Sequence, residues 1–228
     1  MEKFEQYWCY NCGKPFTESI EKTVEHVPMK ALFAERSDEY KKNILTVKGC
    51  FKCNNEYSKL DSVFRDFVSI VVDDNVLSAK MARSIKRSKK FNEIISFDKD
   101  GMNATFDLDV LNKIHYKHMK ALFCVTYAIP FPKDLDIAIG SNYDDSKDPK
   151  HVYRIFETNF LPILDENGKD WKVSGHEDIF SYRIATIRLN KYVEGFQLDV
   201  KELSRNDFIV CEIKYYKSIH TIMVAEIR

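Results

Sequence analysis

The chain has 228 residues, 35 of them basic and 35 acidic, so its formal net charge at pH 7 is zero. An apolar fraction of 44%, with 16 Phe and 12 Tyr, excludes a disordered chain and indicates a packed globular protein. The balanced charge gives no support to nucleic-acid binding by the whole surface, so such binding depends on local basic patches. Neither a signal peptide nor an apolar run of spanning length is present, and we therefore expect a cytoplasmic protein without a membrane partner.

Two Cys-x-x-Cys pairs contain four of the six cysteines: Cys9, Cys12, Cys50 and Cys53. This spacing predicts one tetrahedral Zn²⁺ held by four thiolates, a closed set that leaves no position for water and makes the zinc structural. Core cysteines without metal and a redox pair are the alternatives, and both fit two pairs around a polar motif less well. Cys124 and Cys211 stand alone and are expected to be small buried hydrophobes.

Between the two pairs, the pattern predicts a strand over 17–24 that leads to Glu25-His26 and ends at Pro28. A short helix over 29–35 and a return strand over 43–47 follow. The segment 54–72 after Cys53 has apolar residues three and four apart, which is typical of a helix with one buried face. Asn54, Ser58 and Asp61 share another stripe of this helix.

The segment 76–92 is predicted to be a helix with six basic and no acidic residues. These are Lys80, Arg83, Lys86, Arg87, Lys89 and Lys90. A solvated helix face is the simplest explanation of such a charge run. Because the run follows directly on the segment that contains the four cysteines and the helix after them, and nothing acidic neutralises it, we prefer the hypothesis that it contacts nucleic-acid phosphates.

The rest of the chain predicts an α+β region. Strands around Asp100-Gly101 indicate a hairpin within 94–108, and Asp109 is expected to cap a helix over 110–127. Further strands are expected at 152–156, 171–173, 180–189, 196–200, 208–216 and 221–227, forming an antiparallel sheet packed on one or two helices. His115 and His118 are expected at the core edge or the surface, without a metal.

The order Cys-x-x-Cys, Glu-His-Val-Pro, Cys-x-x-Cys-Asn and a helix with Ser and Asp resembles the zinc-stapled HNH endonucleases. These are His-Me finger, or ββα-metal, nucleases, and the resemblance covers roughly residues 6–70. It implies that His26 is the general base and that Glu25 and Asn54 bind one Mg²⁺ or Mn²⁺. It also implies that Asn43 pins the loop that orients the histidine.

Two positions depart from the family pattern. Glu25 stands where the family usually has Asp, so a bound ion must lie slightly further out, and Asn54 stands where it often has His. Asp61 is a further candidate ligand for the divalent ion or for a water bound to it.

The resulting hypothesis is a metal-dependent endonuclease acting on DNA rather than RNA, with a zinc-stapled ββα core over 1–72 and an α+β domain over 73–228. The resemblance also suggests a role in anti-phage defence or restriction, with a protein partner in a defence complex. Two alternatives stay open. The first is a non-catalytic zinc-stabilised module that binds nucleic acid or protein, and the second is a nuclease subunit active only within a larger complex.

Overall fold

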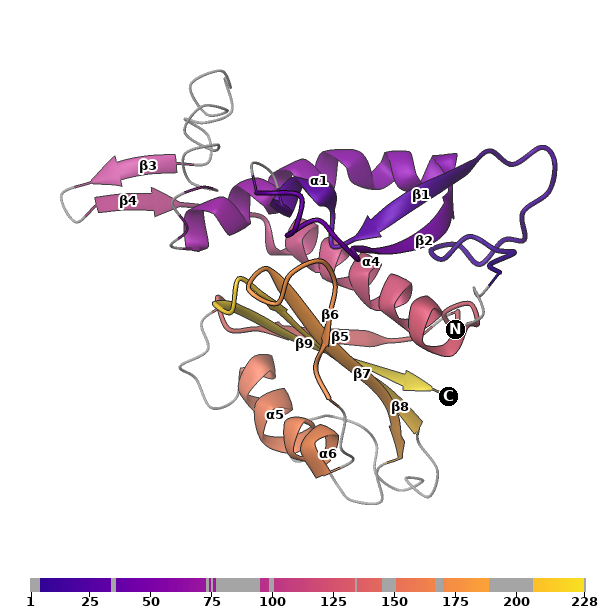
Figure 1. Cartoon of the computed structure of the whole chain (residues 1–228). Helices are drawn as coiled ribbons and strands as arrows, with labels where there is room; N and C mark the ends of the chain where they lie inside the picture. Colours follow the sequence, from indigo (N-terminus) through magenta and orange to yellow (C-terminus); the bar gives the residue numbers. More distant parts are fainter. Residues whose placement is uncertain are drawn as a thin grey trace.

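The computed structural model describes residues 5–33, 36–72, 74, 76, 95–98, 101–133, 135–144, 151–166, 170–188 and 207–227, with the backbone alone at 95–98, 101–104 and 188. The fold is of the predicted α+β class, and all its strand pairs are antiparallel. Helix α4 (Leu108–Tyr127) lies between an N-terminal unit and a five-stranded sheet, and it contacts both (Figure 1). The predicted basic segment 76–92 and the predicted strand 196–200 lie outside the described residues, apart from Val76.

The N-terminal unit is a two-stranded sheet followed at once by a helix. Strand β1 (Lys22–Val27) pairs with β2 (Leu45–Cys50), and β2 continues into α1 (Phe51–Val71). The predicted end of the first strand before Pro28 is confirmed, while the strand itself begins later than expected. The short helix predicted over 29–35 is a single 3₁₀ turn, η1 (Lys30–Phe33).

The middle of the chain follows the predicted hairpin and helix. Strands β3 (Ile95–Asp98) and β4 (Gly101–Ala104) form the hairpin, which projects from the side of the molecule in Figure 1. Helix α4 begins two residues earlier than expected. Its cap is Asp107, whose side chain accepts a hydrogen bond from the backbone N–H of Asp109, so the expected cap at Asp109 is wrong.

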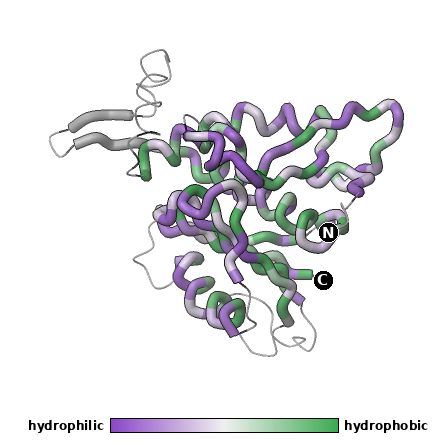
Figure 2. The backbone as a smooth tube through the Cα atoms, viewed as in Figure 1, coloured by the Kyte–Doolittle hydropathy of each residue, from purple (hydrophilic) through white to green (hydrophobic). Residues whose placement is uncertain are grey.

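The C-terminal sheet has the strand order β5-β9-β8-β7-β6. Its strands are β5 (Ile137–Ser141), β6 (Lys172–Val173), β7 (Phe180–Arg188), β8 (Asp207–Tyr215) and β9 (Ile219–Ile227). Ile209 and Ile213 belong to the core shared with α4, whereas Phe208 and Val210 belong to the core beneath α5. Because both faces are covered, β8 is buried along nearly its whole length, and Figure 2 shows hydrophobic segments running along α4 and the sheet.

Two sequence predictions fail in this half. The segment predicted as a strand at 152–156 is the start of helix α5 (Val152–Asn159), which α6 (Leu161–Glu166) follows. His151 caps α5 by accepting a hydrogen bond from the backbone N–H of Tyr153. Strand β5 was not predicted, and it lies at the edge of the sheet beside α5.

A loop after β6 fastens the sheet to the N-terminal unit. The buried Ser174 hydroxyl donates to the carbonyl of Val27 and accepts from the N–H of Leu45 at 2.8 Å. Gly175 has φ +78, and a side chain there would collide with the ring of Phe33, so only glycine suits this contact. The loop therefore braces β1 at its end, one residue after His26.

The core beside α4 contains a chain of polar rings. His115 Nε2 lies 2.8 Å from the Tyr143 hydroxyl, and His118 Nδ1 lies 2.6 Å from the Tyr215 hydroxyl. Both histidines are fully buried, so their predicted place at the core edge or surface is wrong. Burial lowers the pKa of His115 to about 3 and that of His118 well below its ordinary value, which keeps both imidazoles neutral at physiological pH.

These two histidines predict acid sensitivity. In the unfolded chain each imidazole gains a proton near pH 6.5, whereas in the folded protein it stays neutral down to about pH 3 for His115. Stability is therefore complete above pH 6.5 and falls as the pH drops below it. Between about pH 7.5 and pH 5.5, each histidine should lower the free energy of unfolding by roughly 1 kcal/mol. Urea unfolding at both pH values measures this loss, and His115→Gln should remove about half of it. An unchanged loss in His115→Gln would contradict the assignment.

Candidate functional site

Four cysteine side chains converge where the turn that contains Cys9 and Cys12, here called the knuckle, meets the start of α1. Their sulfur atoms all lie within 4.8 Å of one another. The sulfurs of a tetrahedral zinc site are about 3.8 Å apart, given a Zn–S distance of about 2.3 Å. The sequence-predicted set of Cys9, Cys12, Cys50 and Cys53 is thus brought together in a geometry that fits a metal such as zinc. Cys124 and Cys211 are buried elsewhere, as expected.

Backbone contacts hold the first knuckle in shape. The N–H of Cys9 donates to the carbonyl of Lys14 at 2.9 Å. The N–H of Gly13, a residue with φ +66, donates to the carbonyl of Cys9 at 2.9 Å. The amide of Gln6 joins the knuckle to β2 through the carbonyls of Trp8 and Lys48. Burial raises the pKa of the Cys9 thiol, although backbone N–H groups of its neighbours lower it in part. A cation in the cluster would reverse that rise, since thiolates are the form that binds metal.

Glu25 and Asp61, both predicted as ligands of a divalent ion, meet at a lysine. The Nζ atom of Lys117, on α4, lies 2.8 and 2.9 Å from the two carboxylate oxygens of Asp61 and 3.0 Å from Oε1 of Glu25. Lys117 is fully buried and Glu25 is 5% exposed. Burial raises the pKa of Glu25 and of Asp61, and Lys117 opposes that rise in both. As placed, these carboxylates do not fit a divalent ion, because an ammonium already lies between them.

Two tyrosines complete the surroundings of this cluster. The Nζ atom of Lys117 lies 5.3 Å from the ring centre of Tyr57, within the range of a cation–π contact. Tyr10 is fully buried, and its hydroxyl has no hydrogen-bond partner in the described part of the chain. Burial, followed by the charge of Glu25, raises the pKa of Tyr10 well above its ordinary value. The cluster is therefore enclosed by protein on the side of Tyr10 and α4.

His26 lies next to Glu25 on β1, but its side chain points to the opposite face of the strand. Alternate residues of a strand face opposite sides, and the buried residues here are Glu25 and Val27, with His26 half-buried between them. Burial and the charge of nearby Lys30 lower the pKa of His26, so its imidazole is neutral at physiological pH. Lys30 itself is exposed, one turn beyond the strand.

The two asparagines lie at either side of this strand pair. Asn54 is half-buried in the first turn of α1, directly after Cys53. Asn43 is exposed and adopts a left-handed backbone with φ 58, which asparagine tolerates better than most residues. Its carbonyl accepts a hydrogen bond from the N–H of Gly175 at 3.3 Å, so Asn43 links the approach to β2 with the loop that braces β1.

Sequence reasoning missed Lys117 as a member of the site. Ile114, Lys117 and Ala121 are spaced three and four apart along α4 and all are buried. A lysine on the apolar stripe of a helix is the signal that was present, because a buried lysine needs a partner of opposite charge.

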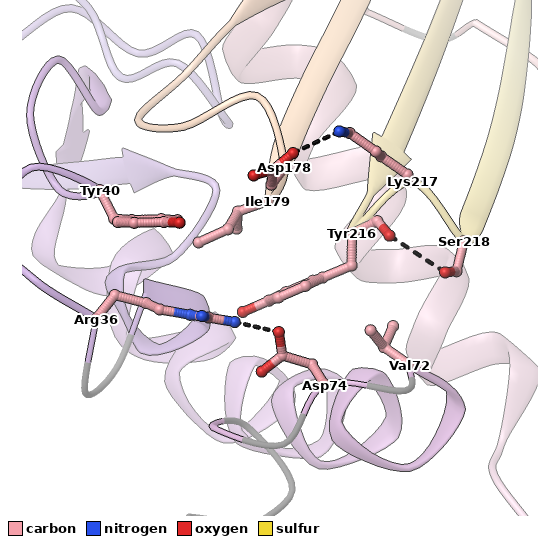
Figure 3. A pocket seen from close by; sticks show the side chains of 9 residues that line it. All are labelled: Arg36, Tyr40, Val72, Asp74, Asp178, Ile179, Tyr216, Lys217 and Ser218. Carbon is pink, nitrogen blue, oxygen red and sulfur yellow. Dashed lines mark hydrogen bonds and ion pairs between the residues drawn. The ribbon is translucent and has the colours of Figure 1, made fainter.

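A pocket of about 330 Å³ lies at a different place, between the segment 36–40, the end of α1, the loop before β7 and the turn from β8 to β9 (Figure 3). Its charged side chains are already paired, Arg36 with Asp74 and Lys217 with Asp178. The Tyr216 hydroxyl donates to the carbonyl of Leu32. The pocket thus offers paired charges rather than a free one to an incoming ligand.

Comparison of the chain with protein-family models, with curated proteins and with solved structures finds no match. In the described ranges, the four cysteines are the one group of three or more Cys, His, Asp or Glu residues placed closely enough to hold a metal. No helix among the described residues combines the length and apolar character that crossing a membrane requires.

The cysteine cluster generates a direct prediction. Metal analysis of the purified protein should return about one zinc per chain, the number that four thiolates hold. The double variant Cys50→Ser, Cys53→Ser should lose both the zinc and the fold of the N-terminal unit, because metal binding and folding are coupled in such sites. Circular dichroism and zinc release would report the two losses. The matched control Cys124→Ser should keep its zinc, and a folded wild-type protein without zinc would contradict the prediction.

Proposed function

We propose that the protein is an HNH-type endonuclease that hydrolyses phosphodiester bonds, with DNA preferred over RNA as substrate. The observation that carries the proposal is the setting of His26. The histidine lies on β1 of a two-stranded sheet, the second strand leads straight into α1, and the four cysteines gather where strand and helix join. This order of elements around the histidine is the one that the resemblance to HNH endonucleases implies.

The chemistry that this setting favours is proton transfer from water. The imidazole of His26 is neutral and half-buried, which suits a general base near neutral pH. As a water oxygen bonds to phosphorus, the imidazole takes the water proton and the bond from phosphorus to the 3′-oxygen breaks. The 3′-oxygen leaves with the electron pair of that bond and takes a proton from solvent. The exposed ammonium of Lys30 is close enough to His26 to influence its pKa, and it offers a positive charge to a phosphate at the same place.

The resemblance further implies one Mg²⁺ or Mn²⁺ bound by Glu25 and Asn54. Such an ion, when bound, stabilises negative charge on the phosphate and the leaving oxygen. Because Glu25 is held by Lys117 in this structure, no step of the proposed reaction is assigned to that ion.

Substrate binding is assigned to the basic segment 80–90, on its sequence alone. Its six cations would neutralise phosphates and add affinity that falls with salt. Participation in anti-phage defence or restriction, together with a protein partner, is the biological part of the proposal, and it derives from the resemblance.

A second function is favoured by one observation. The ion pairs of Lys117 with Glu25 and Asp61 also suit a zinc-stabilised module that binds nucleic acid or protein without cutting it. A nuclease subunit that becomes active only with a partner gives the same result for the isolated chain, and co-purification from the native host separates the two.

Plasmid nicking tests the endonuclease directly. Zinc-loaded wild-type protein is assayed on supercoiled plasmid with Mg²⁺, with Mn²⁺ and without an added divalent ion, and it should nick the plasmid under at least one of these conditions. Under that condition His26→Ala should be slower by at least about a hundredfold, the usual contribution of a general base. The matched control is Thr46→Ala. Thr46 is the cross-strand partner of His26, so its loss perturbs the same strand pair but leaves the imidazole.

Wild type and Thr46→Ala should therefore behave alike. Equal nicking by His26→Ala and wild type would contradict the role of His26. If wild type cuts neither DNA nor RNA under any of these conditions, the free-standing nuclease is wrong and the binding module is favoured.

The basic segment has its own test. Replacing Lys86, Arg87, Lys89 and Lys90 with Gln should weaken DNA binding and reduce the slope of log affinity against log salt by roughly three to four units. Fluorescence anisotropy at several salt concentrations measures this slope. A wild-type slope in this variant would contradict phosphate binding and favour a solvated charge run.

A further inference from the structure

Lys117 joins the site from a helix outside the strand–strand–helix unit. Glu25 comes from β1, Asp61 from α1 and Lys117 from α4, so three elements meet at a single ammonium. The ammonium donates to both carboxylate oxygens of Asp61 at 2.8 and 2.9 Å and forms an ion pair with Oε1 of Glu25 at 3.0 Å. The buried lysine is therefore paired with both acidic side chains.

Burial makes this pairing strict. The side chains of Lys117, Glu25 and Asp61 are 0%, 6% and 20% exposed. An ammonium without solvent at this depth is stable only beside opposite charge, and the carboxylates likewise need a cation. Asp61 is the most exposed of the three and is the member of the cluster that solvent reaches.

An ion and the ammonium compete for the same oxygens. A divalent ion such as Mg²⁺ binds its oxygen ligands at about 2.1 Å, so an ion shared by both carboxylates would have to lie where the ammonium now lies, beside its positive charge. Two ionised carboxylates carry a formal charge of −2, and Lys117 supplies +1. Removing the lysine charge would leave a pair of converging carboxylates whose charge matches one divalent cation.

We propose that Lys117 is the resident cation of the Glu25 and Asp61 carboxylates and excludes a divalent ion from them. The inference concerns the same site as the proposed function, and it is tested by ion binding rather than by cutting. Its failure and the failure of the nuclease proposal are therefore separate results. In this proposal Lys117 acts through the carboxylates of the site and is therefore a positioning residue.

The experiment measures Mn²⁺ uptake by the zinc-loaded full chain, from the electron paramagnetic resonance signal of free Mn²⁺. Wild type should take up no Mn²⁺ that depends on Glu25 and Asp61. Lys117→Met, which keeps the length of the side chain but not its charge, should bind about one Mn²⁺ per chain, at least about tenfold more tightly than wild type. The matched control is Lys113→Met, since Lys113 is an exposed lysine on the same helix.

Thermal unfolding provides a second readout. Lys117→Met leaves two carboxylates without a cation, so its melting temperature should fall and should recover on addition of Mn²⁺, whereas wild type and Lys113→Met should not respond. The triple variant Glu25→Gln, Asp61→Asn, Lys117→Met removes all three charges. It should fold without Mn²⁺ and bind none.

Two results would overturn the proposal. One is Mn²⁺ uptake by wild type that is abolished in the double variant Glu25→Gln, Asp61→Asn, since the ion would then bind beside Lys117. The other is a folded Lys117→Met protein that binds no more Mn²⁺ than wild type. If Lys117→Met does not fold, Lys117→Gln, whose uncharged NH₂ group still offers donors to the carboxylates, takes its place with the same expected gain. A folded Lys117→Gln without that gain overturns the proposal equally.

Discussion

The buried contact between Lys117, Glu25 and Asp61 joins the two halves of the molecule. It ties β1 and α1 to α4, and α4 in turn packs against the C-terminal sheet. An ion cluster of this kind tolerates little displacement, because moving any member leaves a buried charge unpaired. The position of β1, and with it the position of His26, thus depends on a residue more than fifty positions beyond Asp61.

The four cysteines and the loop after β6 fix the same unit from two other directions. The cysteine cluster joins the knuckle to the end of β2 and the start of α1, while Ser174 and Gly175 hold the opposite end of the strand pair. His26 lies between these restraints on a strand that has little freedom to shift. The backbone at His26 is thus held in place, which the proposed role of general base requires.

Local patterns were sufficient to predict much of the fold. The Cys-x-x-Cys spacing, the hairpin turn at Asp100-Gly101, the apolar stripe of α1 and most strands of the sheet follow from residues close in sequence. The first turns of α5 were predicted as a strand because Val152, Tyr153, Ile155 and Phe156 are rich in β-branched and aromatic side chains. Val152 and Ile155 are three apart, as are Tyr153 and Phe156, and this spacing also suits a helix. In the structure the helix buries Tyr153 and Phe156 against the sheet.

The site was predicted less completely, because its decisive contact is tertiary. Sequence identified Glu25 and Asp61 as acidic groups near a zinc knuckle, but it gave no means of placing Lys117 between them. Adjacent residues on a strand also point to opposite faces, so Glu25 and His26 separate in space although they are neighbours in the chain. The arrangement therefore divides the motif into a buried ion cluster and a half-buried, neutral imidazole.

A crystal structure of the zinc-loaded protein grown with excess Mn²⁺ is the most direct test of this division. Anomalous diffraction above and below the manganese edge would locate any Mn²⁺ independently of zinc. The account predicts an anomalous zinc peak among the four cysteines and the Lys117 ammonium between Glu25 and Asp61, with no manganese peak there. A manganese peak on those two carboxylates, with Lys117 turned away, would contradict it.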